Sequence, residues 1–95
     1  MLEIKLDKQF RKDIKRDQKS GKYKEDDFLE LKGVMDSLIE EQALDEKYLE
    51  HKLIGNWRGY LECHIKPNWL LIYKTEEALI KFARLGTHQQ LFKKY

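Results

Sequence analysis

Five consecutive hydrophobic residues, Trp69 to Tyr73, place the tightest limit on how this chain can fold. A strand with one face in water alternates hydrophobic and polar residues, so a run without alternation indicates a strand covered on both faces. Pro67 and Asn68, directly before the run, are residues that favour a turn. The run is much shorter than the roughly 20 residues of a membrane-spanning helix. We therefore expect the central strand of a sheet and no membrane segment.

Strand patterns lie on both sides of this run. Residues 58–66 alternate, with Leu61, Cys63 and Ile65 on one face and polar residues on the other. A turn at residues 75–77 separates the central run from a further strand at residues 79–84. These segments predict a three-stranded antiparallel meander. Alternation at residues 2–6 predicts one more short strand at the start of the chain.

Two helices are predicted between the first strand and the meander. Asp7 occupies a helix N-cap position, Phe10 and Ile14 are spaced i and i+4, and Ser20 and Gly21 end this helix. After Asp26 and Asp27, which suit capping, hydrophobic residues recur at helical spacing: Phe28, Leu31, Val34, Met35, Leu38 and Ile39. Strands grouped after helices favour an α+β fold.

The length of 95 residues allows one hydrophobic core, so we expect a single domain over residues 1–95. Residues 44–56 show no period and predict a surface loop that contains His51. A lone cysteine, Cys63, cannot form an internal disulfide and is interpreted as a small buried residue.

The net charge of +2 hides a segregation of charge along the chain. Residues 25–50 are mainly acidic, whereas the first predicted helix is basic. Such a helix either faces a polyanion or is simply solvated. Its candidate contacts to RNA or the ribosome are Lys8, Arg11, Lys12, Lys15, Arg16 and Lys19.

The meander predicts that polar residues from different strands meet at one end of the sheet. If the second turn is centred on residues 75–76, Arg84 lies opposite Pro67 and Asn68, and His88 falls at the same end. With strands about 4.8 Å apart, the group apart from His88 would lie within ~10–12 Å. Its members are His64, Lys66, Asn68, Arg84 and His88. Structural alternatives exist for three of them: a structural role for His64, a cap for His88, and a pair with Glu62 for Arg84.

Imidazoles with a guanidinium suit acid–base catalysis at a phosphodiester. RNA carries its own nucleophile in the 2′-hydroxyl, and histidine changes charge near neutral pH. Trp69 or Phe92 is expected to stack on a base. The chain's three histidines lack the short spacing that marks many metal sites, so no metal or other cofactor is expected.

The C-terminal half also carries a family pattern. It reads His51-x-Leu53-x-Gly55-x-Trp57, then Glu62-x-His64-Ile65-x-Pro67-x-Trp69-x-Leu71-Ile72-Tyr73, then Arg84-x-Gly86-x-His88-x-x-Leu91-Phe92. This pattern resembles the YafQ branch of the RelE-like toxins, which are mRNA-cleaving components of bacterial type II toxin–antitoxin systems. The resemblance implies a RelE-like fold, with two N-terminal helices packed on an antiparallel sheet of about four strands and a short C-terminal helix.

The resemblance further implies a cytoplasmic, ribosome-dependent and metal-independent endoribonuclease that a cognate antitoxin neutralises, and that contacts operator DNA only through the antitoxin. By match to the family, His88 is expected to be the general acid and Arg84 the phosphate clamp. His64, supported by His51, is expected to supply or order the base. The expected substrate-binding residues are Glu62, Lys66, Asn68, Trp69 and Phe92.

One position departs from the family, which usually carries aspartate where this chain has Asn68. An amide cannot serve as a carboxylate base or hold an imidazolium by charge. Either the histidines take more of the base role, Glu62 compensates, or activity is reduced. The last case leaves two other functions open: a weakened toxin-fold protein that acts as an antitoxin-binding co-repressor, or an RNA-binding module.

Overall fold

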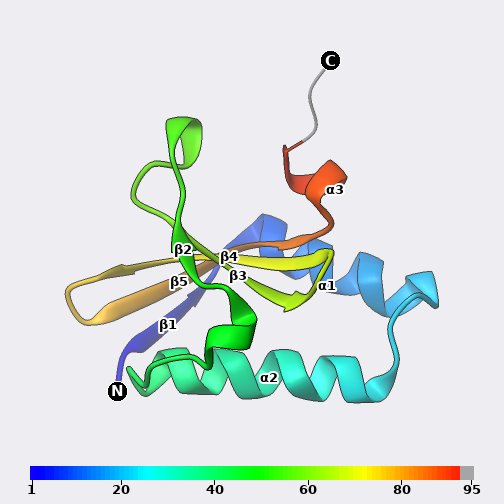
Figure 1. Cartoon of the computed structure of the whole chain (residues 1–95), viewed down its shortest axis with the longest axis horizontal. Coiled ribbons are helices and arrows are strands. Elements are labelled where there is room, and N and C mark those ends of the chain that lie inside the picture. The colour runs from blue at the N-terminus through cyan, green and yellow to red at the C-terminus, as the bar shows by residue number, and fades with distance from the viewer. Residues whose placement is uncertain (93–95) are drawn as a thin grey trace.

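The computed structural model describes residues 1–92 (Figure 1). Within this range no helix is long and apolar enough to cross a membrane. The elements in chain order are β1 (Glu3–Leu6), α1 (Lys8–Ser20), α2 (Glu25–Ile39), the 3₁₀ turn η1 (Glu46–Tyr48), β2 (His51–Lys52), the 3₁₀ turn η2 (Gly55–Trp57), β3 (Leu61–Lys66), β4 (Trp69–Glu76), β5 (Leu79–Gly86) and α3 (His88–Phe92).

The strands form one sheet in the order β1-β5-β4-β3-β2. The predicted meander is present as antiparallel β3, β4 and β5, and β1 joins β5 in parallel. The α+β class, the two N-terminal helices and the short C-terminal helix are confirmed. The sheet has five strands where about four were expected, because residues 51–52 pair with β3. His51 therefore lies in a strand, and the prediction that it lies in a loop was wrong.

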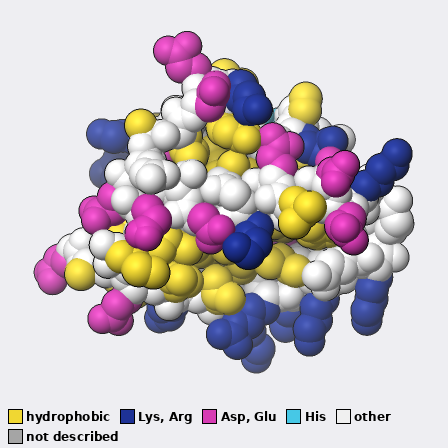
Figure 2. All heavy atoms as spheres, turned by 90° about the horizontal axis from the view of Figure 1, so that it is seen from below, with side chains coloured by type: hydrophobic (Ala, Val, Ile, Leu, Met, Phe, Trp, Pro, Cys, Tyr) yellow, Lys and Arg dark blue, Asp and Glu magenta, His cyan; other side chains and the backbone are white. Residues whose placement is uncertain are grey.

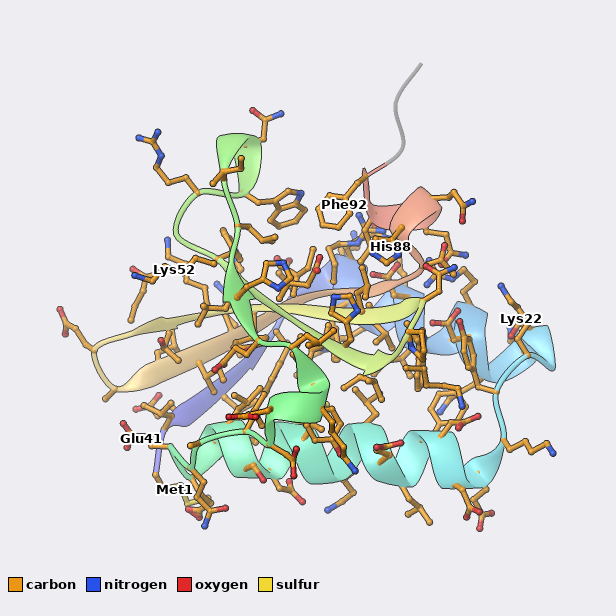
Figure 3. The ribbon with its side chains drawn as sticks, viewed as in Figure 1. Met1, Lys22, Glu41, Lys52, His88 and Phe92 are labelled. Carbon is orange, nitrogen blue, oxygen red and sulfur yellow. The ribbon has the colours of Figure 1, made fainter. Side chains whose placement is uncertain are left out.

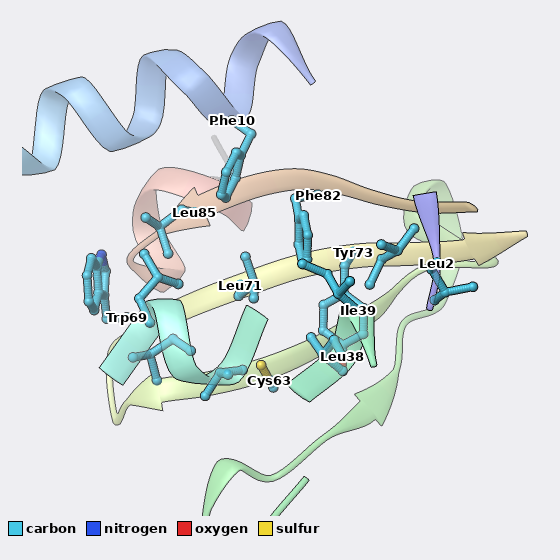
Figure 4. Close-up of a cluster of buried hydrophobic side chains, with 14 residues drawn as sticks. Leu2, Phe10, Leu38, Ile39, Cys63, Trp69, Leu71, Tyr73, Phe82 and Leu85 are labelled. Carbon is cyan, nitrogen blue, oxygen red and sulfur yellow. The ribbon is translucent and has the colours of Figure 1, made fainter. Parts of the chain in front are cut away.

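The central strand is covered on both faces, as its sequence predicts. On one face, α1 and α2 enclose the larger core, in which Phe10, Trp69 and Phe82 are fully buried (Figure 4). On the other face, Leu70 and Ile72 pack under α3 and the segment around η2. Burying a large apolar side chain contributes roughly 1.5–3 kcal/mol, so both layers stabilise β4.

The predicted helix ends are close to the observed ones. Helix α1 follows Asp7 and ends at Gly21, whose φ of 75° suits glycine. Helix α2 begins at Glu25, slightly earlier than the predicted cap. The Asp27 carboxylate instead lies inside the first turn, where it accepts a hydrogen bond of 2.8 Å from the backbone N–H of Lys24.

The second hairpin turn lies later than expected. Strand β4 continues to Glu76 and the chain reverses at Glu77 and Ala78, with Glu77 at φ 47°. Arg84 is consequently opposite Ile72, and the predicted position opposite Pro67 and Asn68 was wrong. Residues 75–77 contain neither glycine nor proline to stop the ladder earlier.

Two register shifts decide which face two basic residues occupy. Between β4 and β5 the extra residue is Ala83, which puts Arg84 on the face of Ile72, under α3. Between β3 and β4 the extra residue is Ile65, which pairs Lys66 with Trp69 on the helix-covered face. Lys66 and His64 therefore lie on opposite faces of the sheet, contrary to the simple alternation predicted from sequence.

The segregated charges of the sequence remain separated on the surface. Seen from the α2 side, acidic side chains are spread over the middle of the view, and Lys and Arg side chains gather along one border (Figure 2). On α1 the side chains of Lys8, Arg11, Lys12, Lys15 and Lys19 are exposed, and none forms an ion pair with another described residue. This leaves one basic helical face open to solvent.

Candidate active site

Three imidazoles from three elements form a row on the sheet face that α3 covers. His51 lies on β2, His64 on β3 and His88 at the start of α3. The ring centroids are 5.9 Å apart for His51 and His64 and 5.7 Å apart for His64 and His88. His88 and Phe92 lie on the same side of the sheet (Figure 3). The structure therefore brings together all three histidines that the sequence singled out.

Glu62 lies beneath this row and contacts two of the three rings. It pairs with His51 across the β2–β3 ladder and precedes His64 by two residues, so all three side chains share one face. Its Oε1 atom is 3.2 Å from Nε2 of His51 and 3.4 Å from Nε2 of His64. The residue is 3% exposed, and Oε2 has no hydrogen-bond partner among the described residues. A buried carboxylate of this kind needs positive or hydrogen-donating neighbours.

The hydrogen bonds of His51 fix which ring nitrogen carries a proton. Nδ1 lies 2.9 Å from the backbone carbonyl oxygen of Leu49, which can only accept, so Nδ1 is the donor. The opposite nitrogen, Nε2, then faces the Glu62 carboxylate. It bears a second hydrogen if the ring is an imidazolium, or a lone pair if a cation is bound beside it. The same reasoning applies to His64. If its Nε2 bears the hydrogen directed at Glu62, the lone pair of the neutral ring is on Nδ1.

Asn68 orients His88. Its Oδ1 accepts a hydrogen bond of 2.9 Å from the backbone N–H of His88 and lies 2.6 Å from Nδ1 of the same residue. An amide oxygen only accepts, so Nδ1 of His88 bears hydrogen and Nε2 is the atom free to exchange a proton. Asn68 thus keeps the orienting hydrogen bond that an aspartate would make, without the negative charge.

Arg84 is held from below by α1. Its Nε lies 2.8 Å from Oδ2 of Asp13, and its Nη2 lies 3.3 Å from Oδ1 of the same residue. Asp13 is 1% exposed and also accepts from the backbone N–H of Leu85 and from Arg16. Arg84 therefore pairs with Asp13, and the pair with Glu62 considered from sequence is absent from the described residues. Its Nη1 has no hydrogen-bond partner there.

Trp69 is a core residue, so the expectation that it stacks on a base does not fit the structure. The side chain is fully buried, stacks on Tyr23 with centroids 4.1 Å apart, and donates its indole N–H to Asp17 at 2.9 Å. Asp17 also accepts from Arg16, which is therefore withdrawn from the exposed basic face. The signal for Asp13 and Asp17 was their spacing from Phe10, which places them on the buried stripe of α1.

The other expected contact residues take different positions. Phe92 is half-buried against the cluster that contains Leu70 and Ile72. Lys66 lies 2.9 Å from Asp27 on α2 and pairs with Trp69, on the helix-covered face of the sheet. This hydrogen bond lowers the pKa of Asp27 below its ordinary value and raises the pKa of Lys66 above its own. Lys66 is thus a tie between sheet and helix.

The same carboxylate and imidazoles form a donor set that fits a metal ion. The ligand atoms of His51, Glu62 and His64 all lie within 4.8 Å of one another. Imidazole nitrogen and carboxylate oxygen suit transition metals, and the bond from His51 to the Leu49 carbonyl is of the kind that orients metal-binding histidines. The pattern was missed in sequence because its spacing is set by a cross-strand pair.

The α+β fold and the imidazole row over a buried carboxylate define the class of protein. Comparison with known proteins identifies the family within that class. Residues 2–93 match the family model described as the bacterial toxin of type II toxin–antitoxin systems, YafQ. The chain belongs to this family. It is 41% identical over 91 residues to the mRNA interferase toxin YafQ of Escherichia coli K12, with 95% of each chain covered.

Solved structures agree with this assignment. The E. coli DinJ–YafQ complex contains a chain that superposes with a TM-score of 0.86 at 40% identity, over 97% of this chain and 99% of that one. A metal-bound toxin from Helicobacter pylori superposes with a TM-score of 0.86 at 38% identity, over 97% of this chain and 100% of that one.

Proposed function

We propose that this protein is a ribosome-dependent endoribonuclease that cleaves mRNA and is neutralised by a cognate antitoxin. The observation that carries the proposal is the imidazole row, in which Glu62 contacts His51 and His64, and Asn68 holds His88 with Nε2 free. The E. coli relative is named an mRNA interferase toxin, and its structure with DinJ supports an antitoxin partner here. We place the activity in the cytoplasm, where ribosomes and mRNA meet.

In the proposed reaction, Nδ1 of His64 takes the proton of an RNA 2′-hydroxyl, while Glu62 and His51 hold that ring in place. The 2′-oxygen forms a bond to the adjacent phosphorus and the bond from phosphorus to the 5′-oxygen breaks. Nε2 of His88 gives its proton to the departing 5′-oxygen. The products are a 2′,3′-cyclic phosphate and a free 5′-hydroxyl, and no net proton is consumed.

Arg84 stabilises the charge that accumulates on the phosphorane oxygens. Because Asp13 occupies Nε and Nη2, we assign this contact to Nη1. Phe92, beside the row at the end of α3, positions the nucleotide. The exposed lysines and Arg11 of α1 dock the protein on ribosomal RNA, a contact whose strength should fall steeply with salt.

We further propose that cleavage needs no metal ion. A metal ion held by His51, Glu62 and His64 would occupy the nitrogens that orient the base. Cleavage should therefore survive EDTA, and added Cu²⁺ or Zn²⁺ should slow it. Loss of cleavage in EDTA, with recovery on adding metal, would contradict this part of the proposal.

The test of the activity is primer extension on an mRNA incubated with the protein, with and without ribosomes. We expect new 5′ ends only when ribosomes are present. Uncut mRNA under both conditions, at high protein concentration, would reject the enzyme.

Asn68 favours a second function, a non-catalytic toxin-fold protein that binds the antitoxin and acts as a co-repressor. Asn68 supplies no negative charge to stabilise an imidazolium at His88, the form that would act as the acid. This function predicts antitoxin binding and operator binding by the complex, without cleavage of ribosome-bound mRNA by the free protein. Operator binding that requires the toxin, combined with no cleavage, would favour it over the enzyme.

A further inference from the structure

A groove of about 350 Å³ is lined in part by His64, whose ring centroid lies 5.7 Å from that of His88. It lies between η1, the first half of α2 and the β3–β4 turn, with Tyr48, Leu49, Ile65 and Pro67 on its walls. His64 lines it, so the groove is continuous with the imidazole row. We call it the Tyr48 groove.

Leu49 forms one wall in a strained conformation. Its φ of 50° and ψ of 45° are left-handed, a region that glycine adopts without steric penalty and leucine does not. The side chain is 59% exposed at the groove. The same backbone turn aims the Leu49 carbonyl at Nδ1 of His51. A glycine would serve that carbonyl contact, so the leucine side chain adds something else, namely an apolar surface beside His64.

The hydrogen bond between Tyr48 and Glu30 determines which of their oxygen atoms can accept a hydrogen bond from a ligand. Tyr48 donates its hydroxyl proton to Oε2 of Glu30 at 2.9 Å. Burial, together with this bond, raises the pKa of Tyr48 to about 12, so the proton stays on the phenol. The phenol oxygen and the free Glu30 oxygen are then acceptors. Lys66 also lines the groove, but its ammonium donates to Asp27 at 2.9 Å. Lys47 also lines the groove and lies over the Tyr48 ring, with Nζ 5.2 Å from the ring centroid.

We propose that the Tyr48 groove receives a nucleobase of the RNA next to the scissile phosphodiester, and that it prefers bases with an exocyclic amino group. The inference rests on the proposed function, because His64 links the groove to the cleavage site. Apolar walls and a hydrogen-bonding edge are how proteins hold unstacked RNA bases. Adenine, cytosine and guanine present an amino donor to Glu30 and Tyr48, whereas uracil presents carbonyl oxygens flanking its single N–H.

The test compares ribosome-bound mRNAs that differ in one nucleotide at each position around the cut. At one position, the full-length parent should cleave RNAs with an amino-bearing base roughly 5- to 100-fold faster than the RNA with uracil. Glu30→Gln, which replaces an acceptor with a donor, should reduce this preference to about twofold or less while cleavage continues. Glu46→Gln, on η1 but outside the groove, is the matched control and should keep the parental preference. Equal preferences in the parent and in Glu30→Gln at every position would overturn the proposal.

A binding measurement separates this inference from the proposed function. Adenosine 5′-monophosphate should shift the Tyr48 ring resonances of the free protein in NMR spectra, and uridine 5′-monophosphate should shift them less. Absence of cleavage by the parent, with the adenosine shifts present, would reject the enzyme and retain the groove as a base-binding site. Absence of any Tyr48 shift with either nucleotide would reject the groove.

Discussion

The Oδ2 atom of Asp13 lies 2.8 Å from Nε of Arg84, although the two residues are 71 positions apart in the chain. Strand β1 pairs with β5 only as far as Phe82, and α1 covers the β5 edge beyond that point. There Asp13 accepts a hydrogen bond from the backbone N–H of Leu85, and Arg16 donates one to the Leu85 carbonyl. One buried carboxylate therefore closes the sheet edge and holds the candidate phosphate clamp.

Asp13→Ala should lower the free energy of unfolding by about 3–5 kcal/mol, because it leaves two guanidinium groups and a backbone N–H without their shared acceptor. Urea unfolding measures this. Lys12→Ala, on the exposed face of the same helix, is the control and should change stability by no more than about 0.5 kcal/mol. An Asp13→Ala protein within 1 kcal/mol of the parent, taken as about the smallest meaningful change, would show that the network is dispensable.

Trp69→Phe should lower stability by about 1–3 kcal/mol, because it leaves Asp17 buried without the indole N–H. Cleavage per folded molecule should stay at the parental rate, since the ring is inaccessible to RNA. Stability comes from urea unfolding and the rate from primer extension on ribosome-bound mRNA. A variant with parental stability and lost cleavage would instead assign Trp69 to substrate binding.

Asn68→Asp should increase the cleavage rate, because it keeps the orienting acceptor and adds a negative charge beside Nδ1 of His88. That charge favours the imidazolium that protonates the leaving oxygen. The decline of the cleavage rate at high pH should therefore begin at a higher pH. Single-turnover rates between pH 6 and 9 measure the change. An unchanged or lower rate across this range would mean that His88 is not limited by the missing carboxylate.

Burial raises the pKa of the Cys63 thiol from 9.0 to about 12. Between these values the unfolded chain loses the thiol proton and the folded chain keeps it, so the free energy of unfolding falls as pH rises. The contribution of one such proton is about 1.4 kcal/mol per pH unit. Urea unfolding from pH 8 to 10 should therefore show a shallower decline for Cys63→Ala than for the parent. Parallel declines would show that the thiol titrates alike in both states.

Much of the fold follows from sequence patterns, because hydrophobic residues that are buried recur at the repeat of the helix or strand that carries them. The run Trp69–Tyr73 and the stripe of α2 each have one solution that hides their apolar side chains. The bulges at Ile65 and Ala83 have no such signature, since each is set by how strands meet. Bulge placement explains why the faces of Lys66 and Arg84 did not follow from alternation.

The three histidines were identified from sequence, but their chemical arrangement was not. Residues 51–52 are too short to show a strand pattern, so the pairing of His51 with Glu62 had no local signal. The spacing of Asp13 and Asp17 places them on the buried side of α1, but their partners, the backbone of Leu85 and the indole of Trp69, come from distant strands. The burial of Trp69 likewise depends on Asp17, 52 residues earlier in the chain.

The central claim, that the imidazole row cleaves RNA, is tested most directly by single-turnover cleavage of ribosome-bound mRNA with His88→Ala. His88 is exposed and outside the core, so the variant should fold normally. The account predicts a loss of about 10²- to 10⁴-fold in rate, the usual contribution of a general acid, with unchanged stability in urea. A His88→Ala protein that cleaves at the parental rate would contradict it.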